Sequence, residues 1–189
     1  MLLRHFPDLD DMRTIDLGGS SAFWSTFPSE RRPKDLTILN LGDDSAPPPN
    51  HVWADACRAN KLFTERSFDL VVSNSVLEHV GGHHRRQLFA RAVHHLAERH
   101  WVQTPNLYFP IEPHWHFPLM QLLPFDTRVL IARHWQFGHV RAESHAEASE
   151  EVASCELVTS SQLRLLFPDS RIWRERALGL TKSLVAIKT

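Results

Sequence analysis

The sequence has little cysteine, almost no net charge and no long apolar run. Its two cysteines, Cys57 and Cys155, stand far apart in 189 residues. They therefore predict neither a disulfide framework nor a metal motif, and a reducing cytoplasm is the expected location. The formal net charge of −1 argues against nucleic acid as a partner, because nucleic-acid binding normally needs a basic face. No window approaches the ~18 consecutive apolar residues of a membrane span, and no signal peptide is predicted.

Several nucleotide-binding motifs are also missing. The first glycine turn reads Asp16-Leu-Gly-Gly-Ser-Ser21, which is neither Gly-x-Gly-x-x-Gly nor a phosphate loop. The only tyrosine, Tyr108, is followed four residues later by Glu112 rather than lysine, so the Tyr-x-x-x-Lys pair of short-chain dehydrogenases is absent. These absences disfavour a nicotinamide cofactor and a nucleoside triphosphate. A nucleoside without a pyrophosphate is the better expectation.

Short apolar runs that end in glycine or polar residues alternate with helical patterns, which is typical of an α/β fold. Phe68–Asn74 is the clearest run, and its continuous apolar character predicts a strand in the middle of a parallel sheet. Apolar residues at helical spacing in His83–Arg99 lead into a strand at Trp101–Pro105, which predicts a parallel crossover unit. Further strands are predicted at 13–17, 36–41 and 51–55.

The C-terminal part predicts a different pairing. Residues 171–178 and 181–188 flank Gly179 and are expected to form an antiparallel pair. A short capped helix is predicted before them at 160–167, a helix broken near Pro124 at 119–132, and an exposed polar segment at 143–154. The chain is thus expected to be one doubly wound α/β domain over residues 1–189, with a mostly parallel sheet and a C-terminal antiparallel hairpin.

The connection between the second and third strands is unusually short. Gly42–Asn50 is too short and too rich in proline for a crossover helix. One face of the sheet should therefore be thinly covered. The sequence predicts that a second copy of the chain, in a homodimer, or a rearranged loop covers that face.

Small and polar residues follow the predicted parallel strands, and ligands of open α/β sheets bind at those carboxyl ends. Thr14–Gly19, Asp55-Ala56 and Ser67–His79 together resemble the ordered motifs of class I S-adenosylmethionine-dependent methyltransferases. Asn40 stands where that family usually has an acidic ribose ligand, so either Asn40 or the nearby Asp43 is expected to fill this role. The resemblance implies S-adenosylmethionine as the cofactor, bound by Asp16, Gly18, Gly19, Asn40, Leu41, Asp55, Ala56, Asn74, Ser75 and Val76.

A narrower resemblance concerns the acceptor. Gln103–His114 and Gly179–Ser183 are similar to segments of small-molecule and sugar O-methyltransferases, including the methylmannose-polysaccharide 1-O-methyltransferase type. This implies methyl transfer to a small molecule, most specifically to a hydroxyl of a sugar or glycan precursor. The alternative is a noncatalytic binding protein with a degraded cofactor site, which the Asn40 departure favours. A metal-dependent hydrolase built on the His/Glu loop is a third reading, which the absence of a nucleophile motif disfavours.

A hydroxyl is a poor nucleophile, so a base or a metal is expected beside the acceptor. His79 follows the fourth strand, and the loop region of about 106–150 supplies further candidates. Alternate residues of an extended segment face the same way, so Glu112, His114 and His116 are predicted to converge on the substrate, where they could also hold a divalent metal. The catalytic candidates are His114, Glu112 and His79, and the substrate-binding candidates are Tyr108, Trp115 and His116.

Overall fold

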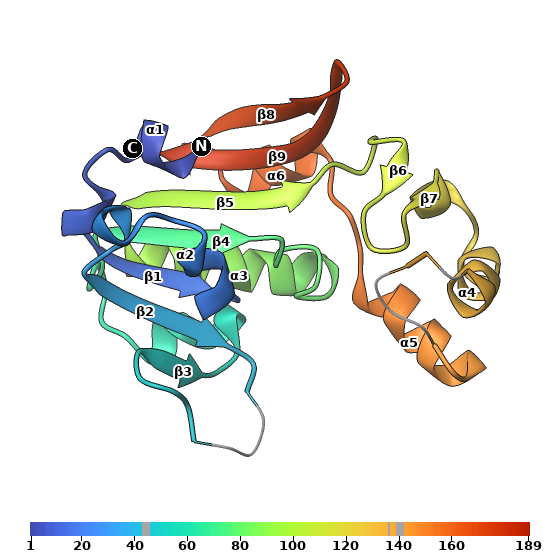
Figure 1. Cartoon of the computed structure of the whole chain (residues 1–189), viewed down its shortest axis with the longest axis horizontal. Coiled ribbons are helices and arrows are strands. Elements are labelled where there is room, and N and C mark those ends of the chain that lie inside the picture. The colour runs from blue at the N-terminus through green and yellow to red at the C-terminus, as the bar shows by residue number, and fades with distance from the viewer. Residues whose placement is uncertain (43–45, 136, 139–141) are drawn as a thin grey trace.

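The computed structural model describes residues 1–42, 46–135, 137–138 and 142–189. Its main sheet has seven strands in the order β3-β2-β1-β4-β5-β9-β8 (Figure 1). The first five strands are parallel, and β9 and β8 are antiparallel to their neighbours. The strands are β1 (Arg13–Leu17), β2 (Asp35–Asn40), β3 (His51–Trp53), β4 (Leu70–Asn74), β5 (Arg99–Pro105), β8 (Arg171–Ala177) and β9 (Leu180–Lys188). The predicted doubly wound sheet with a C-terminal antiparallel hairpin is therefore confirmed.

The central strands are buried on both faces, as continuous apolar runs require. Ile15 and Leu17 of β1 and Val71 of β4 have no exposed surface. Polar residues in these strands have internal partners, and Ser73 Oγ donates a hydrogen bond to the Leu17 carbonyl at 2.9 Å. The sheet interior thus carries no unpaired hydroxyl at this position.

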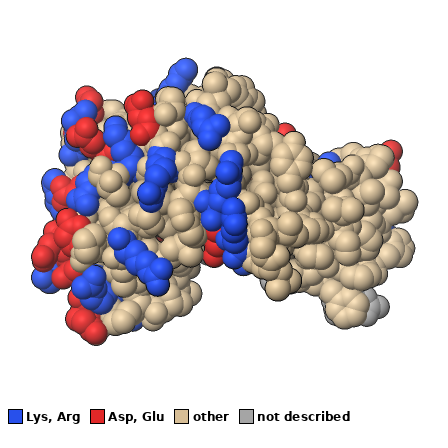
Figure 2. Space-filling model, turned by 90° about the horizontal axis from the view of Figure 1, so that it is seen from above, with Lys and Arg blue, Asp and Glu red and all other residues tan. Residues whose placement is uncertain are grey.

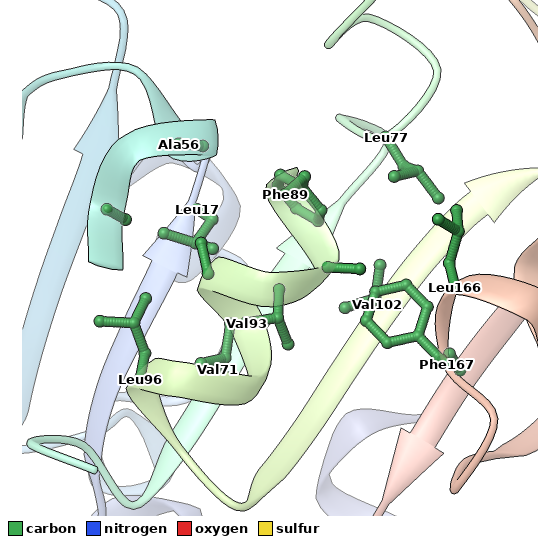
Figure 3. Packing of buried hydrophobic residues seen from close by; sticks show 14 of the residues in the cluster. Leu17, Ala56, Val71, Leu77, Phe89, Val93, Leu96, Val102, Leu166 and Phe167 are labelled. Atoms are coloured by element: carbon green, nitrogen blue, oxygen red, sulfur yellow. The ribbon is translucent and has the colours of Figure 1, made fainter. Parts of the chain in front are cut away.

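One face of the sheet is covered by α3 (Gly82–Leu96), η3 (Ala56–Lys61) and α6 (Ser160–Leu166). Phe89, Val93 and Leu96 of α3 recur at helical spacing, are fully buried and lie over the strands (Figure 3). The helix ends at Leu96, three residues before its predicted end at Arg99, because β5 begins at Arg99. Local periodicity predicted this helix correctly and misplaced only its end.

The other face is covered by the N-terminal segment and by the connection between β1 and β2. The elements are α1 (Leu2–His5), η1 (Leu9–Asp11) and α2 (Ser21–Ser25), with η2 (Ser29–Arg31) following. Phe6, Leu9 and Trp24 pack there against strand residues that include Val72 and Ile187. This segment of the same chain therefore covers the sheet face that was expected to be thinly covered. Thin coverage gives no support to the homodimer, which stays a prediction.

A lobe formed by residues 107–157 lies beyond the carboxyl end of β5 (Figure 1). It contains the hairpin β6 (Ile111–Glu112) and β7 (Phe117–Pro118), then η4 (Met120–Leu122), α4 (Phe125–His134) and α5 (His145–Ser154). The predicted break near Pro124 is confirmed. The polar segment predicted to be exposed at 143–154 is mostly exposed, but it forms a helix: Ser144 caps it, and Ala148 and Val152 pack against α4.

The two parts of the molecule differ in surface character. Figure 2 shows lysine and arginine side chains gathered over the sheet, whereas the lobe side of this face carries few charges. Several large apolar side chains of the lobe are exposed, namely Tyr108, Ile111, Leu119, Leu122, Phe125, Leu130 and Phe137. No helix among the described residues has the length and apolar character needed to cross a bilayer.

Candidate functional site

A cavity of about 230 Å³ lies at the carboxyl ends of β1, β2 and β4. Parallel α/β sheets bind ligands at this edge. Seven of the ten predicted cofactor residues line it. They are Gly18, Asn40, Leu41, Asp55, Ala56, Ser75 and Val76, joined by Leu39, Ala54, His79, Val80 and Arg85.

The wall of the cavity nearest β1 is a tight glycine turn. Gly18 has a φ of +77°, and its N–H donates to the Leu39 carbonyl at 2.6 Å. A Cβ at Gly18 would lie 2.4 Å from a methyl carbon of Val76. Only glycine therefore fits between the first strand and the turn that follows β4.

Asp16 supports this turn from behind and does not line the cavity. Its carboxylate accepts a hydrogen bond from Trp24 Nε1 at 2.7 Å, while the other oxygen has no hydrogen-bond partner among the described residues. A Cβ at Gly19 would lie 1.8 Å from this carboxylate. Burial raises the pKa of Asp16 to about 7, although the Trp24 hydrogen bond opposes the shift.

Asn40 is occupied by the protein itself. Its Nδ2 donates to the Gly19 carbonyl at 2.9 Å, and its Oδ1 accepts from the Leu41 N–H at 2.8 Å. The Asn40 side chain thus joins the end of β2 to the glycine turn, and one lone pair of Oδ1 remains for a ribose hydroxyl. Asp43, the alternative ribose ligand, lies outside the described residues.

Asp55 lies at the far end of the cavity and is paired with a residue of α3. Both carboxylate oxygens accept from Arg85 Nη2 at 2.9 Å, and Oδ1 also accepts from the Cys57 N–H. Burial by itself would raise the pKa of Asp55, but the Arg85 hydrogen bonds lower it on balance. The sequence analysis missed Arg85, because no local pattern couples it to a residue 30 positions earlier.

Ser75 lines this cavity and also lines a larger one of about 590 Å³. It has a φ of +57°, and its Oγ donates to Gln103 Oε1 at 2.9 Å. The larger cavity has aromatic and polar walls. Its lining includes Asn74, Trp101, Gln103, Asn106, Phe109, His116, Trp173, Glu175, Lys182 and Ser183.

The three predicted substrate residues have different surroundings. His116 lines the larger cavity. Trp115 is instead 6% exposed and packs in the lobe core, because its large apolar ring is best buried there. Tyr108 is 69% exposed and lines neither of the two cavities. The cavities described above give no support to Tyr108 and Trp115 as substrate residues, and their contact with substrate stays a prediction.

Glu112, His114 and His79 form a continuous polar chain. His114 Nδ1 lies 2.7 Å from Glu112 Oε1, and His114 Nε2 lies 3.0 Å from His79 Nε2. Glu112 is buried, and its second oxygen accepts from the backbone N–H groups of His114 and Trp115. Burial by itself would lower the pKa of His114, but Glu112 raises it on balance. The pKa of His79 is lowered, first by burial and then by His114.

His116 does not join this chain, which corrects the predicted convergence of three alternate residues. Residues 113–116 form the turn between β6 and β7 rather than an extended segment. His116 has a φ of +52°, and its Nδ1 lies 3.1 Å from the Phe137 carbonyl. The period-two rule holds only along a strand, so Glu112 and His114 meet and His116 turns away.

Two further groups lie beside the chain. Glu78 is fully buried, its Oε2 accepts from Thr104 at 2.9 Å, and burial raises its pKa to about 7. Cys155 Sγ lies 3.4 Å from His114 Nδ1 and 3.9 Å from His114 Nε2. A single cysteine at the end of a polar segment gave no signal of this contact in the sequence.

No protein-family model and no curated protein matches the chain. Solved structures do. An Archaeoglobus fulgidus SAM-dependent methyltransferase is 13% identical, with a TM-score of 0.60 over 99% of this chain and 91% of that one. A Rhodobacter sphaeroides structure named for a Zn-dependent alcohol dehydrogenase is 8% identical, with a TM-score of 0.58 over 97% and 86%. The Burkholderia thailandensis 1,6-didemethyltoxoflavin-N1-methyltransferase is 15% identical, with a TM-score of 0.56 over 98% and 75%.

These similarities define the fold. The chain has the Rossmann-like methyltransferase fold, with its antiparallel β9 inserted between β5 and β8. Identities this low say nothing about the acceptor, and one similar structure carries the name of another activity. The activity therefore has to be argued from the site.

Proposed function

We propose that the protein transfers a methyl group from S-adenosylmethionine to a hydroxyl of a small molecule, most specifically a sugar or glycan precursor. The observation that carries the proposal is a pair of cavities that share Ser75 in their lining, on the ligand-binding edge of the sheet. The smaller one is below the ~300 Å³ typical of a ligand pocket. Together they provide adjoining space for a cofactor and an acceptor.

The smaller cavity has the chemistry that an adenosyl group needs. Asp55 keeps acceptor capacity for an adenine amino group, and Ala56 and Val76 supply apolar walls. Asp16 Oδ1 is buried and has no hydrogen-bond partner among the described residues, which leaves one polar atom unpaired behind the glycine turn. The bound cofactor would supply an activated methyl group, and the protein has to orient an acceptor atom toward it.

The larger cavity suits a sugar. Trp101, Phe109 and Trp173 offer apolar ring faces, and the amides of Asn74 and Gln103 offer hydrogen bonds to hydroxyls. Ligand sites usually combine mostly apolar walls with a few placed polar groups. His116 contributes an imidazole to the same wall.

Glu112, His114 and His79 are proposed to handle the proton of the acceptor hydroxyl. His79 lines the cofactor cavity, and its ring is linked through His114 to the buried Glu112. Glu112 fixes the orientation of the His114 ring and favours its protonated form. His79 holds the cavity end of this chain, where it could contact the acceptor.

Isothermal titration with S-adenosylhomocysteine tests the cofactor half of the proposal. The protein should bind it, and Asp55→Ala should weaken the binding at least about tenfold, the loss expected for one hydrogen bond to a charged group. Asp69→Ala is the matched control, because Asp69 also pairs with an arginine, Arg13, but lines neither cavity. No binding, or equal loss in both variants, would remove the proposal.

Methyl transfer from labelled S-adenosylmethionine to a panel of sugars tests the other half. His114→Ala should spare cofactor binding and lower turnover by 10²-fold or more. Cofactor binding without transfer to any hydroxyl compound would favour the noncatalytic alternative, which the internal bonding of Asn40 supports. The single-domain organisation, the homodimer and the cytoplasmic location stay predictions, and sedimentation of the purified protein tests the homodimer.

A further inference from the structure

His79, His114 and Cys155 come from three separate segments and meet at one point. Their ligand atoms, one from each residue, all lie within 4.8 Å of one another. His79 follows β4, His114 lies in the turn between β6 and β7, and Cys155 follows α5. Two imidazoles and a thiol are the donors that zinc-class transition metals prefer.

We propose that His79 Nε2, His114 Nε2 and Cys155 Sγ bind one zinc-class divalent ion. With ordinary bond lengths and tetrahedral angles, two nitrogens on one zinc lie about 3.3 Å apart, and a nitrogen and a sulfur about 3.6 Å apart. The two nitrogens here are 3.0 Å apart, and His114 Nε2 is 3.9 Å from Cys155 Sγ. Cys155 Sγ lies closer to His114 Nδ1, at 3.4 Å, so the Cys155 side chain has to rotate toward Nε2 to complete the geometry.

The surroundings of His114 support the assignment. Glu112 Oε1 lies 2.7 Å from His114 Nδ1 and so leaves Nε2 as the free ligand atom. Metal-bound histidines are commonly oriented by such a carboxylate on the other nitrogen. Glu112 is itself held by two backbone N–H groups. The ring is therefore fixed before any ion binds.

A hydrogen bond between the two imidazoles also explains their 3.0 Å separation, but it does not explain the buried thiol beside the same ring. Cys155 is 7% exposed, and its Sγ lies 3.4 Å from the His114 ring nitrogen Nδ1. Glu78 Oε1 is also buried near His114 and has no hydrogen-bond partner among the described residues, so a further oxygen is left unpaired beside this cluster.

Three protein ligands leave a fourth position open, which distinguishes catalytic from structural zinc sites. His79 also lines the cofactor cavity, so the ion would lie at its edge. The inference goes beyond the proposed methyl transfer: an ion on the two Nε2 atoms would replace the hydrogen bond between them, so the ion-bound site and the proton chain are alternative states of the same residues. Binding of the ion needs no cofactor and no acceptor.

Titration of chelator-treated protein with Zn²⁺, against a competing fluorescent chelator, tests the inference. We expect one ion per chain and an affinity at least about tenfold weaker in Cys155→Ala and in His114→Gln. Cys57→Ala is the matched control, because Cys57 is the other buried free cysteine and belongs to no metal cluster of the described residues. Glu112→Gln should weaken binding about 10- to 100-fold through the orientation of His114.

Absorption of the Co²⁺-loaded protein provides a second readout. A sulfur-to-cobalt charge-transfer band should appear in the wild type and in Cys57→Ala, and disappear in Cys155→Ser. Absence of that band in the wild type, or equal Zn²⁺ affinity in Cys155→Ala and Cys57→Ala, would overturn the inference. Loss of S-adenosylhomocysteine binding with intact Zn²⁺ binding would remove only the proposed function, and the converse result would remove only the ion site.

Discussion

The glycine turn at Gly18 gives a prediction whose size can be worked out from the structure. Gly18→Ala introduces two costs. The φ of +77° costs any L-residue about 1–2 kcal/mol. The new Cβ would also lie 2.4 and 2.7 Å from the two methyl carbons of Val76, and overpacking of this kind costs about 1–3 kcal/mol. The free energy of unfolding should therefore fall by about 2–5 kcal/mol.

Gly179→Ala separates the two costs. Gly179 has a φ of +82°, and a Cβ there would meet no atom within 4 Å. This variant should carry only the backbone cost of about 1–2 kcal/mol. The difference between the two variants then measures the contact with Val76.

Urea unfolding at a fixed pH is the assay, and a double variant completes it. Val76→Ala removes both methyl carbons and leaves only the Val76 Cβ, 3.1 Å from the new atom. In that background the cost of Gly18→Ala should fall toward that of Gly179→Ala, with a small excess from the remaining 3.1 Å contact. If Gly18→Ala in the wild-type background is as mild as Gly179→Ala, the close approach of the two turns that shapes the cofactor cavity is wrong.

Two further predictions concern stability. Burial raises the pKa of Asp16 from 3.8 to about 7, so the folded state keeps a proton that the unfolded state releases. Its contribution to stability is present below about pH 4 and is lost as the pH rises to 7, by up to about 4 kcal/mol. Unfolding measured at pH 4.5 and 7.5 should depend less on pH in Asp16→Asn, and equal dependence would contradict the assignment. Thr159 accepts from the Gln162 N–H at the start of α6, and Gln162 accepts in return. Thr159→Ala should cost about 1 kcal/mol, whereas the exposed Ser161→Ala should stay within about 0.5 kcal/mol.

Local patterns were sufficient for the parts of the fold that depend on neighbouring residues. The strand β4 begins with the three consecutive apolar residues 70–72, and the following helix repeats its apolar residues every three or four positions. The polar segment at 143–154 is mostly exposed, as its composition predicts, but its helix was not predicted from the sequence. Two small apolar residues, Ala148 and Val152, fix this helix because α4 provides a surface for them to pack against.

One part of the candidate site could also be predicted from local sequence, and another part could not. The sequence by itself determined the glycine turn and the polar ends of β2 and β4, because a strand that ends in such residues carries them to one edge of a parallel sheet. Only the tertiary structure decided that Arg85 pairs with Asp55, that Cys155 meets His114, and that a turn directs His116 away from Glu112. These contacts join residues of different elements or depend on one bend of the backbone. A periodic pattern in the sequence predicts neither kind of contact.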